Sequence, residues 1–292
     1  MHSKCKTWYL AARPRTLTAA VMPVLIGTAL AYRDGGFALL PALVAMICAF
    51  LLQIGSNLAN DLFDYLSGAD TKERKGPMRV VAAGLVSPTQ MKIALVLVFG
   101  TAFALGMYLV CIGGWPVLVV GIASIIVAIA YTAGPYPLGY YGLGDAMVFL
   151  FFGLIGTIGT YYVQTVTVSF TAFLVSLPVG ALITNILIVN NYRDFETDRK
   201  AGKRTTAVIF GKKFARTEFI VFLFASYAVP LLIWLFYDHS AWILLPFASF
   251  PIALRLIAMM NTLQGRELNL ALEQTAKLVA VYGILFAIGI SV

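Results

Sequence analysis

Charged residues and cysteines are both scarce in this sequence. Only 12% of its 292 residues are charged, against about 25% in an average soluble domain, and so few charges could not cover the surface of a soluble fold. A soluble enzyme, a disordered chain and a fibrous protein are therefore excluded. The three cysteines, Cys5, Cys48 and Cys111, are scattered along the chain, so neither a disulfide framework nor the spacing of a zinc site is present.

Long apolar runs take up most of the chain, whose residues are 60% hydrophobic with a mean hydropathy of +0.88. About 20 apolar residues cross the hydrocarbon core of a bilayer as a helix. Runs of this kind, separated by short polar gaps, lie at residues 16–33, 38–59, 90–112, 115–133, 144–164, 168–190, 215–237, 241–260 and 271–291. The sequence thus predicts one all-α, polytopic membrane domain over residues 1–292, with nine transmembrane helices in a lipid bilayer.

The first run allows two interpretations. Basic residues precede it and the small residues Ala29-Leu30-Ala31 end it, as in a secretory signal peptide. Because eight more apolar runs follow, we interpret it as the first transmembrane helix.

The distribution of Lys and Arg predicts the orientation. The net charge of +8 would suggest nucleic-acid binding in a soluble protein, but in a membrane protein Lys and Arg gather in cytoplasmic loops. With the N-terminus inside, twenty of the 21 basic residues lie in inner segments and only Arg33 lies outside. We therefore expect no nucleic-acid partner, and we expect an inner or plasma membrane protein with a cytoplasmic N-terminus and cytoplasmic Asp-rich loops.

Two inner segments, at the ends of the second and sixth runs, repeat a pattern of amide and carboxylate side chains. The two patterns are Asn57-x-x-Asn60-Asp61-x-x-Asp64 and Asn190-x-x-x-Asp194-x-x-x-Asp198. If the helices continue, each set lies on one face, because residues four, seven or eight apart are neighbours on a helix. Similar half-motifs four spans apart predict two pseudo-repeated halves around a central cavity.

The oxygen atoms of these side chains suggest a metal site. Mg²⁺ binds through few carboxylates and otherwise through water and phosphate oxygens, so we predict two or three Mg²⁺ ions around a diphosphate. Polar residues at the edge of hydrocarbon are costly and mark functional sites, although acidic residues at helix ends also occur simply as solvated, paired charges. The predicted metal ligands are Asn57, Asn60, Asp61, Asp64, Asn190, Asp194 and Asp198, and the four aspartates are also the predicted catalytic residues.

Basic residues follow both acidic motifs at similar distances. Lys75 and Arg79 follow the first motif, and Lys203 and Arg204 follow the second. Such charges orient the chain in the membrane, and they are also placed to neutralise phosphate oxygens that the metal ions leave bare. We predict that these four residues bind the diphosphate.

A third inner loop, residues 131–145, is rich in tyrosine, glycine and proline and contains no Lys or Arg. Its tyrosines fit an interfacial aromatic belt, or a pocket whose ring faces stack on an aromatic substrate and stabilise a cation. Arg13, at the inner mouth of the first run, is either a topology anchor or a ligand of an anionic substrate group. The predicted acceptor and cation pocket consists of Arg13, Tyr131, Tyr136, Tyr140 and Asp145.

The two acidic motifs resemble those of the UbiA superfamily of membrane prenyltransferases. Further resembling stretches are residues 13–18, 76–81, 131–140, 142–145 and 202–205, so the resemblance extends from residue 13 to about residue 211. Superfamily members often have a further Asp at the position of Gly68, whereas here Asp70 lies two residues later. The menaquinone branch of the superfamily is similar to this sequence at that point.

The resemblance implies a nine-helix fold and an Mg²⁺-dependent electrophilic aromatic substitution. It implies that a polyprenyl diphosphate and 1,4-dihydroxy-2-naphthoate are the substrates, and that the ring carboxylate leaves as CO₂ to give demethylmenaquinone. Within the superfamily, 4-hydroxybenzoate as acceptor and phytyl diphosphate as donor stay open. The paired half-motifs also fit a cation-coupled transporter, but transporter sites lie near the bilayer midplane, whereas these charges lie at one face.

Overall fold

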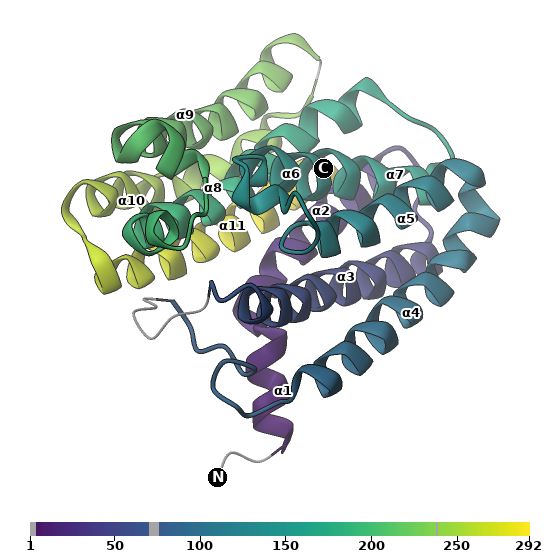
Figure 1. Ribbon diagram of the computed structural model, residues 1–292. Helices are drawn as coiled ribbons and strands as arrows, with labels where there is room; N and C mark the ends of the chain where they lie inside the picture. The colour runs from purple at the N-terminus through teal and green to yellow at the C-terminus, as the bar shows by residue number, and fades with distance from the viewer. Residues whose placement is uncertain (1–3, 70–75, 238) are drawn as a thin grey trace.

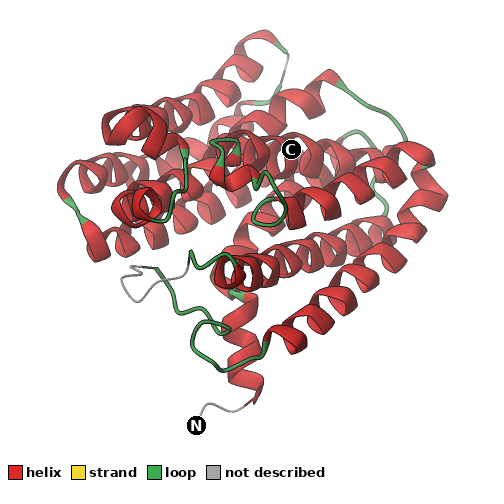
Figure 2. Ribbon diagram, in the orientation of Figure 1, coloured by secondary structure: helices red, strands yellow, loops and turns green. Residues whose placement is uncertain are grey.

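The computed structural model describes residues 4–69, 76–237 and 239–292, and within these ranges the chain consists of helices and loops without a strand (Figure 2). The α-helices are α1 (Lys4–Ala12), α2 (Leu17–Arg33), α3 (Leu39–Leu66), α4 (Pro88–Gly113), α5 (Trp115–Ala130), α6 (Gly144–Val148), α7 (Gly156–Thr165), α8 (Phe170–Lys200), α9 (Thr206–Phe236), α10 (Phe250–Thr262) and α11 (Leu268–Ser291). Short 3₁₀ segments are η1 (Pro14–Thr16), η2 (Leu138–Tyr140), η4 (Ala241–Ser249) and η5 (Gly265–Glu267), and η3 (Phe149–Ile155) is a π-helix. The predicted all-α class is confirmed.

The predicted membrane spans coincide with these helices. In the described part of the chain, seven helical segments are long and apolar enough to cross a membrane, and α1 with α2 forms one further, bent candidate. Helix α5 has 16 residues and coincides with the fourth predicted run. Each of the nine predicted runs therefore overlaps a helix, and the chain is a multi-pass membrane protein.

The fifth span and the span formed by α9 are irregular. The fifth consists of α6, η3 and α7 in succession, and it approaches α8 so closely that a Cβ on Gly153 would lie 2.5 Å from the Cα of Gly180. Helix α9 is interrupted at Gly211, whose φ of 87° lies in the left-handed region that glycine adopts without steric cost. The predicted seventh run begins at residue 215, just beyond this interruption.

The helices that carry the acidic motifs pack in corresponding ways. Helix α3 packs against α4, the next long helix, and α8 packs against α9 (Figure 1). The larger hydrophobic cluster joins α2, α8, α9, α10 and α11, and a smaller cluster joins α3, α4 and the loop at residues 80–86. Helix α2 contacts α3, α7 and α11, so it connects the two parts. This arrangement agrees with the predicted pseudo-repeat.

Helix caps fix the two loops that follow the acidic motifs. The Ser87 hydroxyl accepts a hydrogen bond from the Gln90 main-chain N–H and the Gln90 side chain accepts one from the Ser87 N–H, so a capping box starts α4. The Thr205 hydroxyl accepts a hydrogen bond from the Val208 N–H at the start of α9. Ser87 lies eight residues after Arg79 and Thr205 directly after Arg204, so each cap marks the point where its loop ends and the next helix begins.

Candidate active site

A cavity of about 1640 Å³ lies between the helices. Its walls come from α2, α3, α4, α5, α7, α8 and α11. Polar side chains line one part, among them Asn57, Asn60, Asp64, Arg79, Asn190, Asp194, Asp198 and Lys203, and apolar side chains of α4, α5 and α7 line much of the rest. Residues of both acidic motifs, which are far apart in the sequence, therefore share one cavity, as predicted.

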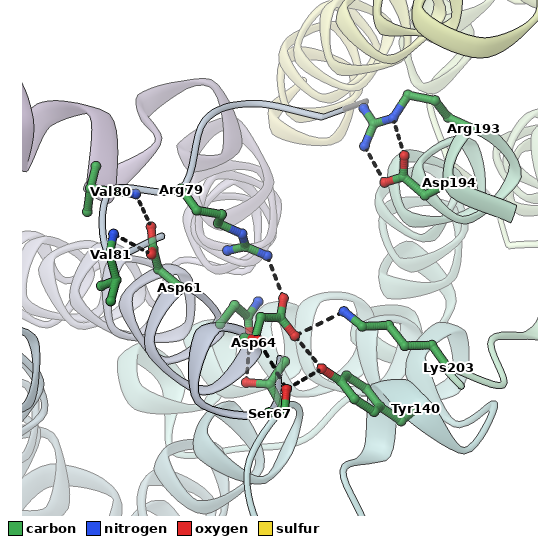
Figure 3. Close-up of polar contacts among 12 residues, drawn as sticks. Asp61, Asp64, Ser67, Arg79, Val80, Val81, Tyr140, Arg193, Asp194 and Lys203 are labelled. Carbon is green, nitrogen blue, oxygen red and sulfur yellow. Dashed lines mark hydrogen bonds and ion pairs between the residues drawn. The ribbon is translucent and has the colours of Figure 1, made fainter. Parts of the chain in front are cut away.

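Asp64 is the centre of the polar part. Its carboxylate accepts hydrogen bonds from Arg79 Nη2 at 2.8 Å, Lys203 Nζ at 2.9 Å and the Tyr140 hydroxyl at 2.5 Å (Figure 3). The Lys203 ammonium also lies over the Tyr140 ring, 4.5 Å from its centroid. The side chain of Asp64 is 2% exposed, and burial of a charge is tolerated only when it is paired and hydrogen-bonded. Two cations from two different loops are thus held beside one carboxylate at the cavity wall.

Asp61 lies differently from its neighbours in the motif. Its two carboxylate oxygens accept hydrogen bonds from the main-chain N–H groups of Val80 and Val81, at 3.0 and 3.1 Å (Figure 3). Asp61 is not among the residues that line the cavity. These bonds tie α3 to the loop that carries Arg79. Asp61 thus anchors this loop, and its role as a metal ligand stays a prediction.

The two asparagines of the first motif line the cavity and hold neighbouring segments. The Asn57 amide donates to the Ala12 carbonyl and to the Thr16 hydroxyl, each at 2.9 Å, and this joins α3 to the bend between α1 and α2. The Asn60 carbonyl oxygen accepts a hydrogen bond from the Thr132 hydroxyl at 3.0 Å. Arg13 lies in that bend with a φ of 51°, a conformation uncommon outside glycine, and it lines the cavity.

The second motif also opens into the cavity. Asn190, Asp194 and Asp198 all line it, as the predicted helical face requires. Asp194 forms a two-point ion pair with Arg193, with distances of 2.8 Å from Nε and 2.6 Å from Nη2 (Figure 3). Arg193 donates in addition to the side chain of Asn269 at 2.7 Å, so the carboxylate of α8 is connected to the start of α11.

The four predicted diphosphate ligands are not equivalent. Arg79 and Lys203 line the cavity and contact Asp64. Arg204 is exposed and does not line the cavity, and its main-chain N–H donates to the Tyr140 carbonyl. Lys75, and Asp70 of the first motif region, lie outside the residues that the structure describes.

The predicted acceptor pocket is only partly assembled. Tyr131 and Tyr140 line the cavity. The Tyr140 hydroxyl is bound to Asp64 and the Lys203 ammonium lies over the Tyr140 ring, so this ring face is already occupied. Tyr136 is 72% exposed and packs on Tyr141. Asp145 is buried behind the cavity wall, where it accepts hydrogen bonds from Thr206 and Asn191; these two predicted residues do not line the cavity.

Tyr131 faces the acidic groups from the end of α5. Burial raises the pKa of its phenol well above the usual value, and the nearby carboxylates of Asp145, Asp64 and Asp198 raise this pKa further. Both effects disfavour the phenolate. The neutral phenol is therefore the favoured form of Tyr131 at the cavity wall.

The family follows from a comparison with known proteins. The model of the UbiA prenyltransferase family matches residues 20–279, which is most of the chain. This chain belongs to the UbiA prenyltransferase family.

Individual relatives agree with this membership. The 1,4-dihydroxy-2-naphthoate octaprenyltransferase of Escherichia coli is 36% identical over 295 residues, covering 99% of this chain and 96% of that protein. The protein of the same name from Haemophilus influenzae is 35% identical over 303 residues, covering 99% of this chain and 97% of the relative. A solved structure of a UbiA homolog from Archaeoglobus fulgidus bound to GPP and Mg²⁺ has a TM-score of 0.67 at 15% identity, with 98% of this chain and 100% of that chain covered. That structure has the same fold.

This UbiA family member also has cavity residues that the sequence did not single out. Arg193 lines the cavity beside Asp194, and Asn269, Glu273 and Lys277 line it from α11. Arg193 directly precedes Asp194 in the second motif, so the sequence did offer a signal that Arg193 lies near the acidic site. Lys277 is one of the basic residues that predict the orientation, and it lies within the ninth predicted run and within α11.

The donor atoms of the cavity suit Mg²⁺. No group of three His, Cys, Asp or Glu side chains close enough to hold a metal ion occurs within the described ranges. Mg²⁺ does not need one, because it is commonly bound through one or two carboxylates and completes its shell with water and phosphate oxygens. Asp64, Asp194 and Asp198 supply carboxylates to one cavity, and Asn60 and Asn190 supply amide oxygens. The residues present therefore fit the ion together with a diphosphate.

Proposed function

We propose that this chain transfers a polyprenyl group from an allylic polyprenyl diphosphate to 1,4-dihydroxy-2-naphthoate, with loss of the ring carboxylate as CO₂, to give demethylmenaquinone. The observation that carries the proposal is the single cavity that both acidic motifs share, with an apolar part adjoining the polar one. The names of the full-length relatives from E. coli and H. influenzae support the choice of acceptor and donor.

The diphosphate would bind in the polar part of the cavity. Arg79 and Lys203 are placed to move from Asp64 onto phosphate oxygens, because each ends within 3 Å of that carboxylate, where a bound cation would compete with them. Asp64, Asn60, Asn190, Asp194 and Asp198 would hold two or three Mg²⁺ ions. When bound, Mg²⁺ neutralises charge on the leaving diphosphate, and the UbiA homolog from A. fulgidus binds Mg²⁺ with GPP.

The prenyl tail would occupy the apolar part. Helix α5 contains no buried residue, yet Val117, Gly121 and Ile125 on it line the cavity. Helix α5 is therefore a thin wall between the cavity and the lipid. Such a wall suits a long isoprenoid chain that enters sideways from the bilayer, and its apolar side chains exclude water from the allylic cation that forms when the diphosphate leaves.

Filling the apolar part should shorten the accepted donor. Gly106 on α4 lines the cavity, and a Cβ built there meets no atom within 4 Å. We expect Gly106→Leu to lower kcat/KM for octaprenyl diphosphate about 5- to 150-fold relative to geranyl diphosphate, because overpacking costs about 1–3 kcal/mol. Gly100→Leu is the matched control, since Gly100 lies on the same helix, also has open space, and does not line the cavity. Equal loss of both donors in Gly106→Leu would contradict the placement of the tail.

We propose a cytoplasmic N-terminus and cytoplasmic Asp-rich loops, on the strength of the Lys and Arg distribution. In a chain whose three cysteines are replaced by alanine, a cysteine at Ala83, which is exposed, should react with a membrane-impermeant maleimide only after the cells are opened. A cysteine at Phe37, between α2 and α3 and also exposed, should react in intact cells. The reverse pattern would overturn the orientation.

The function itself is tested by competition between acceptors. Purified protein in liposomes receives octaprenyl diphosphate and equal amounts of 1,4-dihydroxy-2-naphthoate and 4-hydroxybenzoate, with either Mg²⁺ or EDTA. The proposal expects a prenylated naphthoquinol in the Mg²⁺ sample, no product with EDTA, and little prenylated benzoate. A product that is mainly prenyl-4-hydroxybenzoate would show that 4-hydroxybenzoate, and not the naphthoate, is the acceptor. The absence of both products would contradict the proposed function.

A further inference from the structure

Helix α11 presents a polar stripe to the cavity. Asn269, Glu273 and Lys277 are spaced at i, i+4 and i+8, which places them on one face of a helix, and all three line the cavity. The segment Gly265–Ser291 that contains them is a candidate membrane span. Ionisable residues inside a span are costly and mark a functional site, so this face of α11 needs an explanation that the diphosphate site does not supply.

The two charged members of the stripe, Glu273 and Lys277, have no side-chain partner among the residues that the structure describes. Glu273 precedes Lys277 by four residues, an order that favours an ion pair on a helix. Within the described ranges, however, neither side chain forms an ion pair or a hydrogen bond with any other residue, and both are exposed. The acids of the two motifs differ in this respect, because Asp64 and Asp194 are paired with cations. The pair Glu273 and Lys277 is therefore available to a ligand.

The position of the stripe relates it to the reaction. Asn269 accepts a hydrogen bond from Arg193, which pairs with Asp194, so the stripe begins beside the second acidic motif. Each step of four residues advances about 6 Å along a helix. Glu273 and Lys277 thus lie about 6 and 12 Å further along α11 than Asn269, in the same cavity as Arg79 and Lys203.

We propose that Lys277 binds the carboxylate of the aromatic acceptor and that Glu273 accepts a hydrogen bond from one of its ring hydroxyls; this inference rests on the proposed function. Lys277 supplies one positive charge and Glu273 supplies a hydrogen-bond acceptor. The pair therefore suits a ligand that carries one negative group beside a hydroxyl donor. A diphosphate, with several negative charges, is repelled by Glu273 and is better served by Arg79 and Lys203. The two substrates then bind on different walls, the donor at α3 and α8 and the acceptor at α11.

The test compares two acceptors in variants of Lys277. Wild-type protein and Lys277→Met are assayed with 1,4-dihydroxy-2-naphthoate, and 1,4-dihydroxynaphthalene, which lacks the carboxylate, is measured as a competitive inhibitor. Loss of a charge-assisted hydrogen bond should raise KM for the naphthoate about 10- to 100-fold, while KM for octaprenyl diphosphate and Ki for the diol stay unchanged. Lys277→Arg should restore most of the affinity because it keeps the charge. Lys213→Met, at an exposed lysine of α9 outside the cavity, is the matched control.

Glu273→Gln provides the second arm, with Glu267→Gln, an exposed glutamate that does not line the cavity, as its control. Glu273→Gln should weaken the naphthoate and the diol alike, because both carry the ring hydroxyls. The inference is overturned if Lys277→Met still binds the naphthoate as tightly as wild type does, or if it loses affinity for the donor instead. Failure of the proposed function is recognised separately, because wild-type protein would then convert no naphthoate in the same assay.

Discussion

Asp64→Asn is expected to lower prenyl transfer by at least about 10²- to 10³-fold, the loss typical when one preorganised electrostatic contact to the reacting group is removed. Asp64 is the point where Arg79, Lys203 and Tyr140 meet, and it is a proposed Mg²⁺ ligand. Asparagine keeps the size of the side chain and one oxygen acceptor, so it disturbs the buried contacts less than alanine would. Turnover in liposomes, with protein yield and thermal unfolding measured on the same preparation, separates a catalytic loss from a folding loss.

Asp194→Asn should cause a loss of similar size, and the double variant Asp64→Asn/Asp194→Asn should be little worse than either single one. Residues that act on one bound unit are strongly non-additive, and here both carboxylates are proposed to act on one diphosphate. Glu196→Gln is the matched control on α8, because Glu196 is exposed and forms only a long, 3.8 Å ion pair with Lys212, a kind of contact that contributes little. Near-normal turnover of Asp194→Asn would show that the second motif is structural.

Substitution of the neighbouring residues Lys203 and Arg204 should affect KM for the prenyl donor very differently. Lys203 lines the cavity and lies 2.9 Å from Asp64, so Lys203→Met should raise KM for the prenyl donor about 10- to 150-fold, the equivalent of a lost charge-assisted contact of about 1.5–3 kcal/mol. Arg204 is exposed and outside the cavity, so Arg204→Met should change KM by no more than about twofold, as for most surface substitutions.

Steady-state kinetics with each substrate varied at saturating levels of the other measure this difference. KM for the naphthoate should be nearly unchanged in both variants. If Arg204→Met lost donor affinity as strongly as Lys203→Met, the diphosphate would have to extend beyond the cavity to the exposed side of the loop.

The membrane spans and the shared cavity could be predicted from the sequence because they rest on long, repeated signals. Apolar runs of about 20 residues define spans without tertiary information. The two acidic motifs repeat at the ends of corresponding runs, so a common cavity followed from symmetry, and Asn190, Asp194 and Asp198 line it together.

The detailed role of Asp61 could not be predicted in this way, because a helical face is broad. Successive residues turn by about 100°, so Asp61 points about 40° to one side of Asn57, whereas Asn60 points about 60° to the other side. The cavity lies on the side of Asn60. Asp61 therefore contacts the loop that carries Val80 and Val81. The position of that loop depends on tertiary packing, which the sequence pattern does not give.

The polar stripe of α11 was overlooked for a related reason. Glu273 and Lys277 lie near the start of an apolar run, where a charge is normally assigned to the adjoining loop. Helix α11 begins at Leu268, so Lys277 is about 13 Å into the helix at 1.5 Å per residue. The three-dimensional packing of α11 was needed to show that its polar face lines the cavity.

The most direct test of prenyl transfer to the naphthoate uses an acceptor labelled with ¹⁴C in its carboxylate. Wild-type protein in liposomes with Mg²⁺ and octaprenyl diphosphate should release one labelled CO₂ for each prenylated product formed, and Asp64→Asn should lose both signals together. A prenylated product that keeps the label, or labelled CO₂ released without the prenyl donor, would contradict the account.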